Sequence, residues 1–215
     1  MISSIDIQIT KIDLLLYGTV LIISNIIINQ LNKINIFNKT STTLTIATLL
    51  GVALHRLFTN KISYILNNSL KIKNYNIKHF VYNLIKFGTI FITQNIVVSY
   101  FDNTGIVFDK LWFINSILTI IIYTIFNICE SLLPNVGEYQ QLFNDLIIVS
   151  SSSLIVSYFI YNNINNENLI ESGALIVGLV VFHLIVKKFI IPKKKTKVVG
   201  SFTTIPDFNK LHNNN

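Results

Sequence analysis

The sequence predicts an all-α membrane protein with about six transmembrane helices arranged as three helical hairpins. Two observations support this fold class. Hydrophobic residues make up 51% of the chain and charged residues only 13%, whereas a typical soluble domain carries about a quarter charged residues. The apolar residues also gather in blocks of roughly 17–23 residues, the length that a helix needs to cross a hydrocarbon core about 30 Å thick.

Six apolar blocks are expected to form the spans. Their approximate ranges, in chain order, are 12–28, 41–58, 80–100, 111–128, 142–161 and 169–191. Short polar turns separate several of them, which favours antiparallel neighbours and therefore three helical hairpins. Strands of a membrane barrel would be about ten residues long with strict alternation. The runs of consecutive isoleucines in these blocks do not alternate, so helices are predicted instead.

The polar and basic segment 59–79 is predicted to hold a further short helix. Within it, Ile62, Ile65, Leu66 and Leu70 recur at helical spacing. We expect an amphipathic helix that lies on the membrane interface. The chain then divides into a transmembrane domain, 1–191, and a basic tail, 192–215.

Lysines are divided unevenly between the two sides of this six-span arrangement. One side holds the N-terminus, the segments 59–79 and 129–141, and the C-terminal tail. It carries Lys61, Lys71, Lys73, Lys78, Lys193, Lys194, Lys195 and Lys197. Because basic loops stay on the cytoplasmic side, both termini are predicted to be cytoplasmic.

Two features leave the number of spans open. The segment 129–141 contains Glu130 and Glu138 but no basic residue, although it is placed on the basic side. The first block is interrupted by Asp13, Ser24 and Asn25. An arrangement with four or five spans is therefore the alternative.

One internal match suggests a repeated unit. Residues 17–28 align without a gap on residues 87–98, and the identical positions include a Gly-Thr step and the pair Asn25 and Asn95. In the fifth block, Asp145 stands in the place of Asp13. Some transporters are built from parallel repeats, so the match predicts a two-helix unit present two or three times. The alternative is a chance match, which an isoleucine-rich composition makes common.

Polar residues inside the spans are the candidate functional residues, because each polar group in hydrocarbon needs a partner. The candidates are Asn25, Gln94, Asn95, Ser150, Ser153, Ser157 and His183. They could line a polar conduit. They could instead form hydrogen bonds between helices, with Gly18 and Gly88 permitting close approach.

No carboxylate is expected near the centre of a span, which argues against an ion-coupled pump. His55 and Arg56 are interpreted as the end of the second span, with side chains that reach the interface, and His183 as a helix contact. Histidine and cysteine spacings typical of metal sites are missing, as are phosphate loops and nucleophile motifs. We therefore expect no enzyme activity, no metal and no cofactor.

The end of the sixth span is strongly basic. Its cluster consists of Lys187, Lys188, Lys193, Lys194, Lys195 and Lys197. Each lysine near an anionic leaflet contributes about 1 kcal/mol of binding free energy, so the lipid bilayer and its anionic headgroups are the expected partners. Recruitment of an acidic partner is the alternative, no specific nucleic-acid binding is predicted, and a homo-oligomer is compatible with the sequence.

Two functions are compatible with these features. The first is a non-enzymatic component that organises or populates a membrane. Arg56 is the only arginine among 17 basic residues, a bias typical of AT-rich genomes, so the internal membrane of a large DNA virus is one setting. The alternative is a small channel or transporter for ions or small solutes, built from repeated helical hairpins.

Overall fold

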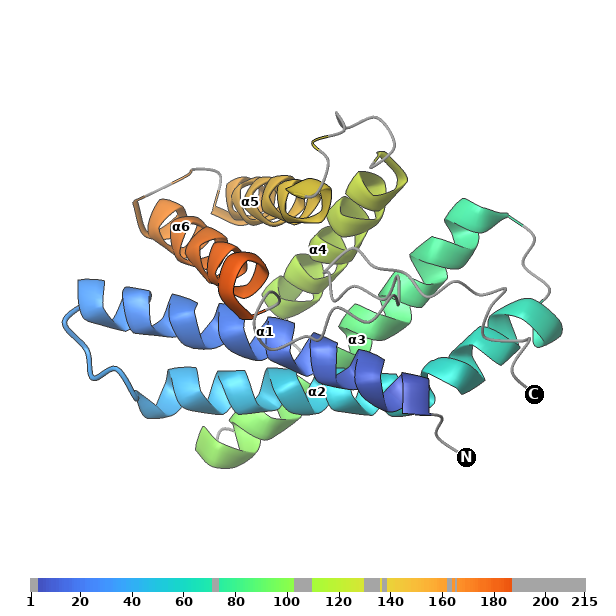
Figure 1. Cartoon of the computed structure of the whole chain (residues 1–215). Coiled ribbons are helices and arrows are strands. Elements are labelled where there is room, and N and C mark those ends of the chain that lie inside the picture. The colour runs from blue at the N-terminus through green and yellow to red at the C-terminus, as the bar shows by residue number, and fades with distance from the viewer. Residues whose placement is uncertain are drawn as a thin grey trace.

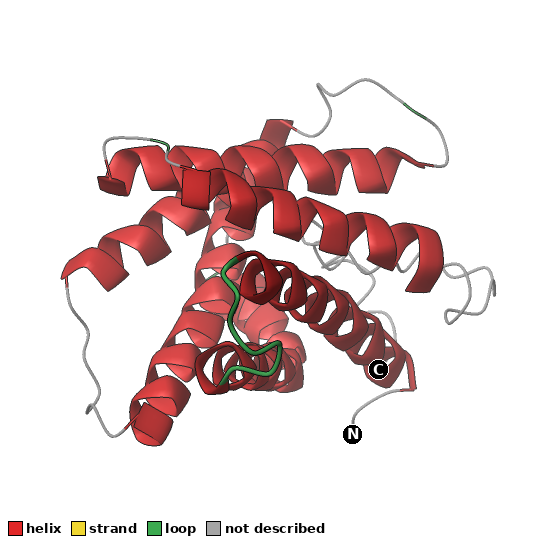
Figure 2. Ribbon diagram, turned by 90° about the vertical axis from the view of Figure 1, so that its left-hand side faces the viewer, coloured by secondary structure: helices red, strands yellow, loops and turns green. Residues whose placement is uncertain are grey.

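The protein is predominantly helical in the part that the computed structural model describes, which comprises residues 4–70, 74–102, 110–129, 136, 139–161, 164 and 166–186. Figures 1 and 2 show the arrangement, and the described residues form no strand. The helices are α1 (Ser4–Leu31), α2 (Lys39–Tyr64), α3 (Tyr75–Asp102), α4 (Lys110–Cys129), α5 (Gln140–Tyr161) and α6 (Asn166–Val181). Two π-helical turns, η1 (Ile65–Ser69) and η4 (Phe182–Val186), continue α2 and α6.

Five of the helices are long and apolar enough to cross a membrane. These are the segments Lys11–Leu31, Lys39–Asn68, Asn76–Asp102, Gln140–Phe159 and Asn166–Ile185. Within α4, the shorter segment Ser116–Ile125 is apolar. The all-α prediction is confirmed, and the apolar blocks coincide with five to six long helices.

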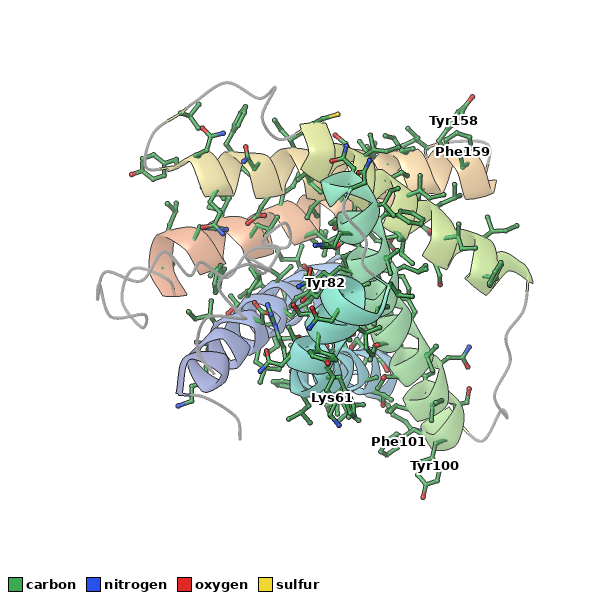
Figure 3. All side chains as sticks on the ribbon, turned by 90° about the vertical axis from the view of Figure 1, so that its right-hand side faces the viewer. Lys61, Tyr82, Tyr100, Phe101, Tyr158 and Phe159 are labelled. Carbon is green, nitrogen blue, oxygen red and sulfur yellow. The ribbon has the colours of Figure 1, made fainter. Side chains whose placement is uncertain are left out.

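The segment 59–79 differs from the prediction. Instead of starting a separate amphipathic helix, the chain continues α2 to Tyr64 and then forms η1. Ile62 and Leu66 are buried in a small cluster with Tyr82 of α3, which is labelled in Figure 3. The separate helix is therefore not formed: Ile62 and Leu66 pack against α3, whereas Ile65 and Leu70 of the same stripe are exposed.

The described helices close into a ring in chain order. Each helix packs against the next one along the chain, and α6 returns to pack against α1. The contacts between α2 and α3 and between α1 and α6 are the most extensive, and α1 lies between α2 and α6 in Figure 1. One hydrophobic core fills the centre: Ile12, Leu16, Tyr17, Val20, Val52, Phe87, Ile90, Ile120, Tyr123, Ile148, Val149, Leu179 and Phe182.

Two glycines allow the closest helix contacts. A Cβ atom on Gly51 of α2 would lie 2.8 Å from the Cα of Ile90 in α3, and one on Gly178 of α6 would lie 2.8 Å from Val20 in α1. The glycines predicted for this role do not have it. Gly18 would meet only Leu49, at 3.7 Å, and Gly88 would meet nothing within 4 Å.

Alanine substitutions of these glycines should therefore have opposite effects. Gly51→Ala forces the α2 and α3 backbones apart and should lower the free energy of unfolding by about 1–3 kcal/mol. Gly88→Ala is the matched control, because its Cβ has open space and alanine favours a helix by about 0.5–1 kcal/mol over glycine. Thermal unfolding of the purified full chain in detergent, followed by circular dichroism, measures both. Equal effects of the two substitutions would contradict the close approach at Gly51.

Candidate functional site

Five ionisable side chains lie buried or largely buried in the ring, and we call them the ionic centre. They are Asp13 of α1, Arg56 of α2, Lys86 of α3, Asp145 of α5 and His183 of η4. Asp13, Lys86 and Asp145 lie in the N-terminal halves of α1, α3 and α5, whereas Arg56 lies in the C-terminal half of α2 and His183 in the turn that follows α6. The sequence analysis placed no carboxylate near the centre of a span. Asp13 and Asp145 lie near the first residues of the apolar segments Lys11–Leu31 and Gln140–Phe159, and both are buried inside the protein.

Arg56 and Asp13 form an ion pair between α2 and α1. The Nε and Nη2 atoms of Arg56 both contact one carboxylate oxygen of Asp13, and the two side chains are 9% and 3% exposed. The sequence suggested that Arg56 lies at a helix end and reaches the interface, and this was wrong. α2 continues for about two more turns after Arg56, and the Arg56 side chain faces α1. His55 beside it is also buried, with its Nε2 3.0 Å from the hydroxyl of Tyr82.

His183 and Asp145 form the second pair. The Nε2 atom of His183 lies 2.9 Å from a carboxylate oxygen of Asp145, and the side chains are 4% and 0% exposed. An ionised carboxylate only accepts hydrogen bonds, so Nε2 carries the proton and Nδ1 is free to bind another. His183 belongs to a π-helical turn, a distortion that often occurs at functional sites. It contacts another helix, as the sequence suggested.

Lys86 differs from the other members of the ionic centre in its contacts. The residue is 3% exposed, and its ammonium lies 5.7 Å from the ring centroid of Tyr17 and 5.5 Å from that of Phe87. Within the described part of the chain, no carboxylate lies within ion-pair distance of it and no hydrogen bond reaches it. It interacts at longer range with the charges of Asp13, Arg56 and Asp145.

The fixed charges of the ionic centre sum to zero when His183 is neutral. Asp13 and Arg56 cancel each other, and the remaining carboxylate of Asp145 is matched by the distant ammonium of Lys86. The sequence analysis missed Lys86, although a lysine inside an apolar block was the signal that could have found it. Burying an unbalanced charge costs several kcal/mol, so a centre of zero net charge is the arrangement that the core tolerates.

Asn25, Gln94 and Asn95 lie away from the ionic centre and do not converge on one cavity. Asn25 donates to the hydroxyl of Thr45 at 2.8 Å, and Gln94 donates to that of Thr48 at 2.6 Å. Both bonds reach α2 from neighbouring helices. Asn95 accepts a bond from Ser99 of its own helix. Interhelical hydrogen bonds of this kind contribute about 0.6–2 kcal/mol each.

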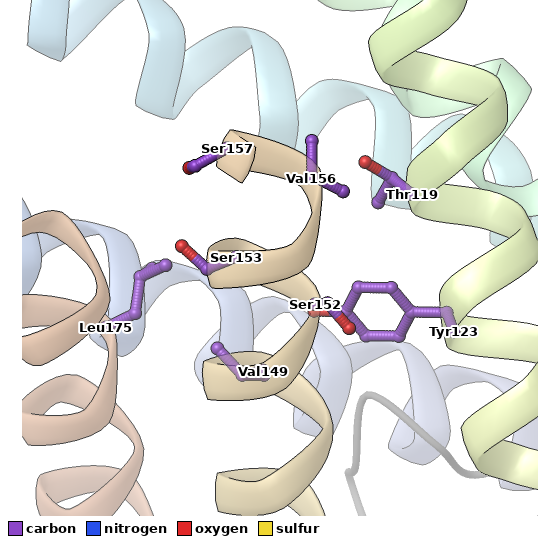
Figure 4. A pocket seen from close by; sticks show the side chains of 8 residues that line it. All are labelled: Thr119, Tyr123, Val149, Ser152, Ser153, Val156, Ser157 and Leu175. Atoms are coloured by element: carbon purple, nitrogen blue, oxygen red, sulfur yellow. The ribbon is translucent and has the colours of Figure 1, made fainter. Parts of the chain in front are cut away.

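Two of the candidate serines line a cavity of about 240 Å³ between α4, α5 and α6 (Figure 4). Its lining consists of Thr119, Tyr123, Val149, Ser152, Ser153, Val156, Ser157 and Leu175. Ser153 lies 2.7 Å from Ser172 of α6, hydroxyl to hydroxyl. In Figure 4, Tyr123 extends from α4 toward Ser152 of α5, and Tyr123 also interacts with the charge of Asp145. Ser150 bonds to the backbone of its own helix.

The three odd-numbered helices bury equivalent positions. Extending the alignment of residues 17–28 with 87–98, and of Asp13 with Asp145, gives three sets of five residues that are all buried. They are Ile12, Asp13, Leu16, Tyr17 and Val20 of α1; Tyr82, Asn83, Lys86, Phe87 and Ile90 of α3; and Asn144, Asp145, Ile148, Val149 and Ser152 of α5. The second position of each set bonds to the following helical segment, through Asp13–Arg56, Asn83–Thr124 at 3.4 Å, and Asp145–His183.

Loss of one partner of the Asp13–Arg56 pair should destabilise the ring strongly. Asp13→Asn leaves Arg56 as an uncompensated buried charge, which costs about 3–5 kcal/mol, and the double variant Asp13→Asn/Arg56→Gln should recover part of the loss. The matched control is Lys39→Gln. It breaks the ion pair of Lys39 with Asp102, whose side chains are 66% and 32% exposed, and should cost less than about 1 kcal/mol. Urea unfolding of the detergent-solubilised chain measures the differences, and equal losses for Asp13→Asn and Lys39→Gln would contradict the burial of the pair.

The basic cluster predicted at the end of the sixth span, Lys187, Lys188, Lys193, Lys194, Lys195 and Lys197, lies outside the described residues. The ionic centre, the cavity beside it and the repeated pattern of buried positions are thus the features from which a function can be argued. Comparison of the chain with protein-family models, with curated proteins and with solved structures gave no match.

Proposed function

We propose that the chain is an integral membrane protein that crosses the bilayer six times, as three helical hairpins with both termini in the cytoplasm. The long apolar helices support this, as does the repeated pairing of each odd-numbered helix with the helical segment that follows it. Exposed aromatic residues lie near the ends of α3 and α5: Tyr100, Phe101, Tyr158 and Phe159 (Figure 3). Aromatic residues of this kind are enriched at the two membrane interfaces.

We further propose that the protein transports ions or small charged solutes. The observation that carries this proposal is the ionic centre, to which α1, α2, α3, α5 and η4 each contribute a buried or largely buried ionisable side chain. Ionisable groups at membrane depth are costly, and they mark pathways for ions, protons or substrates. The hypothesis of a purely organising protein relied on the lack of such groups, and the burial of Asp13, Lys86 and Asp145 removes that reason.

A structural membrane component is the second candidate, and the interhelical contacts favour it. Asp13 and Asp145 both have partners in direct contact, and Asn25 and Gln94 form helix-to-helix hydrogen bonds. Such pairs can fix the register of a helical bundle without any transport. The two candidates differ in whether Lys86 is needed for flux.

The proposed topology exposes the turn before α2 on one side of the membrane and the turn after α2 on the other side. On a Cys129→Ser background, single cysteines replace Asn32, which follows α1, or Asn74, which precedes α3. In cells or sealed inside-out vesicles, a membrane-impermeant maleimide should label the cysteine at position 74 from the cytoplasmic side and the one at position 32 from the other. Labelling of both from the same side would rule out a membrane-spanning α2.

Flux through purified protein in sealed liposomes tests the transport proposal. A panel of sodium, potassium, chloride, lactate and protons, followed with ion-selective electrodes and pH-sensitive dyes, should reveal movement of at least one species by the unmodified chain. Lys86→Met should abolish that flux, because it removes the buried charge that lacks a direct counter-charge. Lys39→Met is the control, since Lys39 is exposed at the start of α2, and it should retain the flux. No flux of any species, or full flux in Lys86→Met, would favour the structural candidate.

A further inference from the structure

We propose that the ionic centre binds one small monovalent anion at Lys86 together with one proton at Nδ1 of His183. This inference rests on the proposed transport function and names its substrate class. Three observations carry it: the departure of Lys86 from the repeated pattern, the surroundings of its ammonium, and the charge of the centre as a whole.

Lys86 departs from the pattern that the three odd-numbered helices share. The equivalent positions in α1 and α5 are Leu16 and Ile148, both of which are fully buried core residues. The same packing position is therefore filled twice by an aliphatic side chain, so the packing of the ring does not require a charge there. Residues that break the local rules of a fold tend to mark functional sites. The break lies at a lysine, whose compact ammonium is a binding group for anions.

The ammonium of Lys86 has hydrogen-bond donors that are available to an anion. An ammonium offers three hydrogen-bond donors, and none of the described residues accepts a bond from this one. Its near neighbours are the rings of Tyr17 and Phe87, at 5.7 and 5.5 Å. Aromatic faces attract the cation but do not replace an acceptor. An anion at this place would supply the missing acceptor, and the apolar rings beside it would suit a halide or a small carboxylate.

The charge of the centre limits the anion to one negative charge and requires a proton with it. With a neutral His183 the centre has no net charge, so an added anion alone would leave one uncompensated negative charge inside the ring. A proton from solvent that binds to Nδ1 of His183 restores neutrality, and no covalent bond other than this N–H is made or broken. Because one proton is taken up together with the anion, the anion should bind more tightly as the pH falls.

The groups around His183 are compatible with the uptake of a proton. Asp145 of α5 holds Nε2, and Asp13 and Tyr17 lie on α1, which packs directly against η4. Arg56 acts on Asp13 from α2, Lys86 acts on both carboxylates from α3, and Tyr123 acts on Asp145 from α4. The two acidic residues of α6, Glu167 and Glu171, lie at least three turns from His183 along the helix. The carboxylate in direct contact with the histidine is thus that of Asp145.

Anion binding can be measured without transport, by calorimetry on the purified full chain in detergent. Chloride and lactate serve as the two probes, each titrated at about pH 5.5 and at about pH 8, on either side of the ordinary histidine range. We expect one of them to bind to one site, at least about tenfold more tightly at the lower pH, with uptake of one proton shown by the dependence of the heat on the buffer. Lys86→Met should abolish binding, and Lys86→Arg should retain it.

His183→Gln separates the proton from the anion. It keeps a hydrogen bond to Asp145 but cannot take up a proton, so the anion should bind with the same weak affinity at both pH values. Lys39→Met is again the control with unchanged binding, and circular dichroism shows whether each variant is folded. Should Lys86→Met fail to fold, the comparison of His183→Gln with the unmodified chain still decides, because a pH dependence that survives in His183→Gln contradicts the proposal. If liposomes show flux while neither probe binds, the inference fails and the transport proposal stands; if both assays are negative, both fail.

Discussion

The buried charges of Asp13 and Asp145 constrain the rest of this structure more than any other feature. A carboxylate taken out of water costs several kcal/mol unless a cation or a set of donors lies beside it. Each of these two carboxylates is satisfied from a different helical segment, Asp13 by Arg56 and Asp145 by His183. The position of α1 relative to α2, and of α5 relative to η4, therefore follows from the need to keep each pair together.

Close backbone contact at two glycines completes the ring. Gly51 and Gly178 lie at the two most extensive interfaces, α2 with α3 and α1 with α6. If the helices lie in lipid, no hydrophobic effect drives them together, and van der Waals packing at small residues takes its place. The contact at Gly178 brings α6 against α1, and η4, which carries His183, also packs against α1, the helix of Asp13. Packing and charge thus depend on each other.

Much of the fold could be predicted from the sequence, because the information lies in runs of adjacent residues. The apolar blocks predicted where the helices lie. The match between residues 17–28 and 87–98 also aligned the buried faces of α1 and α3. The direction in which a single side chain points was harder to predict. Gly18 and Gly88 were expected at close contacts, whereas Gly51 and Gly178 form them, since only the packed ring decides which glycine meets a neighbouring backbone.

The candidate site was predicted only in part, for a related reason. Asp13 and Arg56 lie close to the ends of apolar blocks, where charged residues normally reach water, so nothing local indicated that they face each other. His183 was identified because it lies inside a block, and Lys86 could have been identified in the same way. Extension of the internal sequence match by a few residues, to Asn83 and Lys86, would have placed these polar positions on the same buried face as Asp13.

The protonation state of the ionic centre is the most direct test of this account. Nitrogen-15 solid-state NMR of the full chain in lipid bilayers, near neutral pH and with no small anion other than buffer, measures it at each side-chain nitrogen. The account predicts a charged ammonium at Lys86, a charged guanidinium at Arg56, and a His183 ring with a proton on Nε2 and none on Nδ1. A neutral Lys86, or a His183 ring that carries both protons under these conditions, would contradict it.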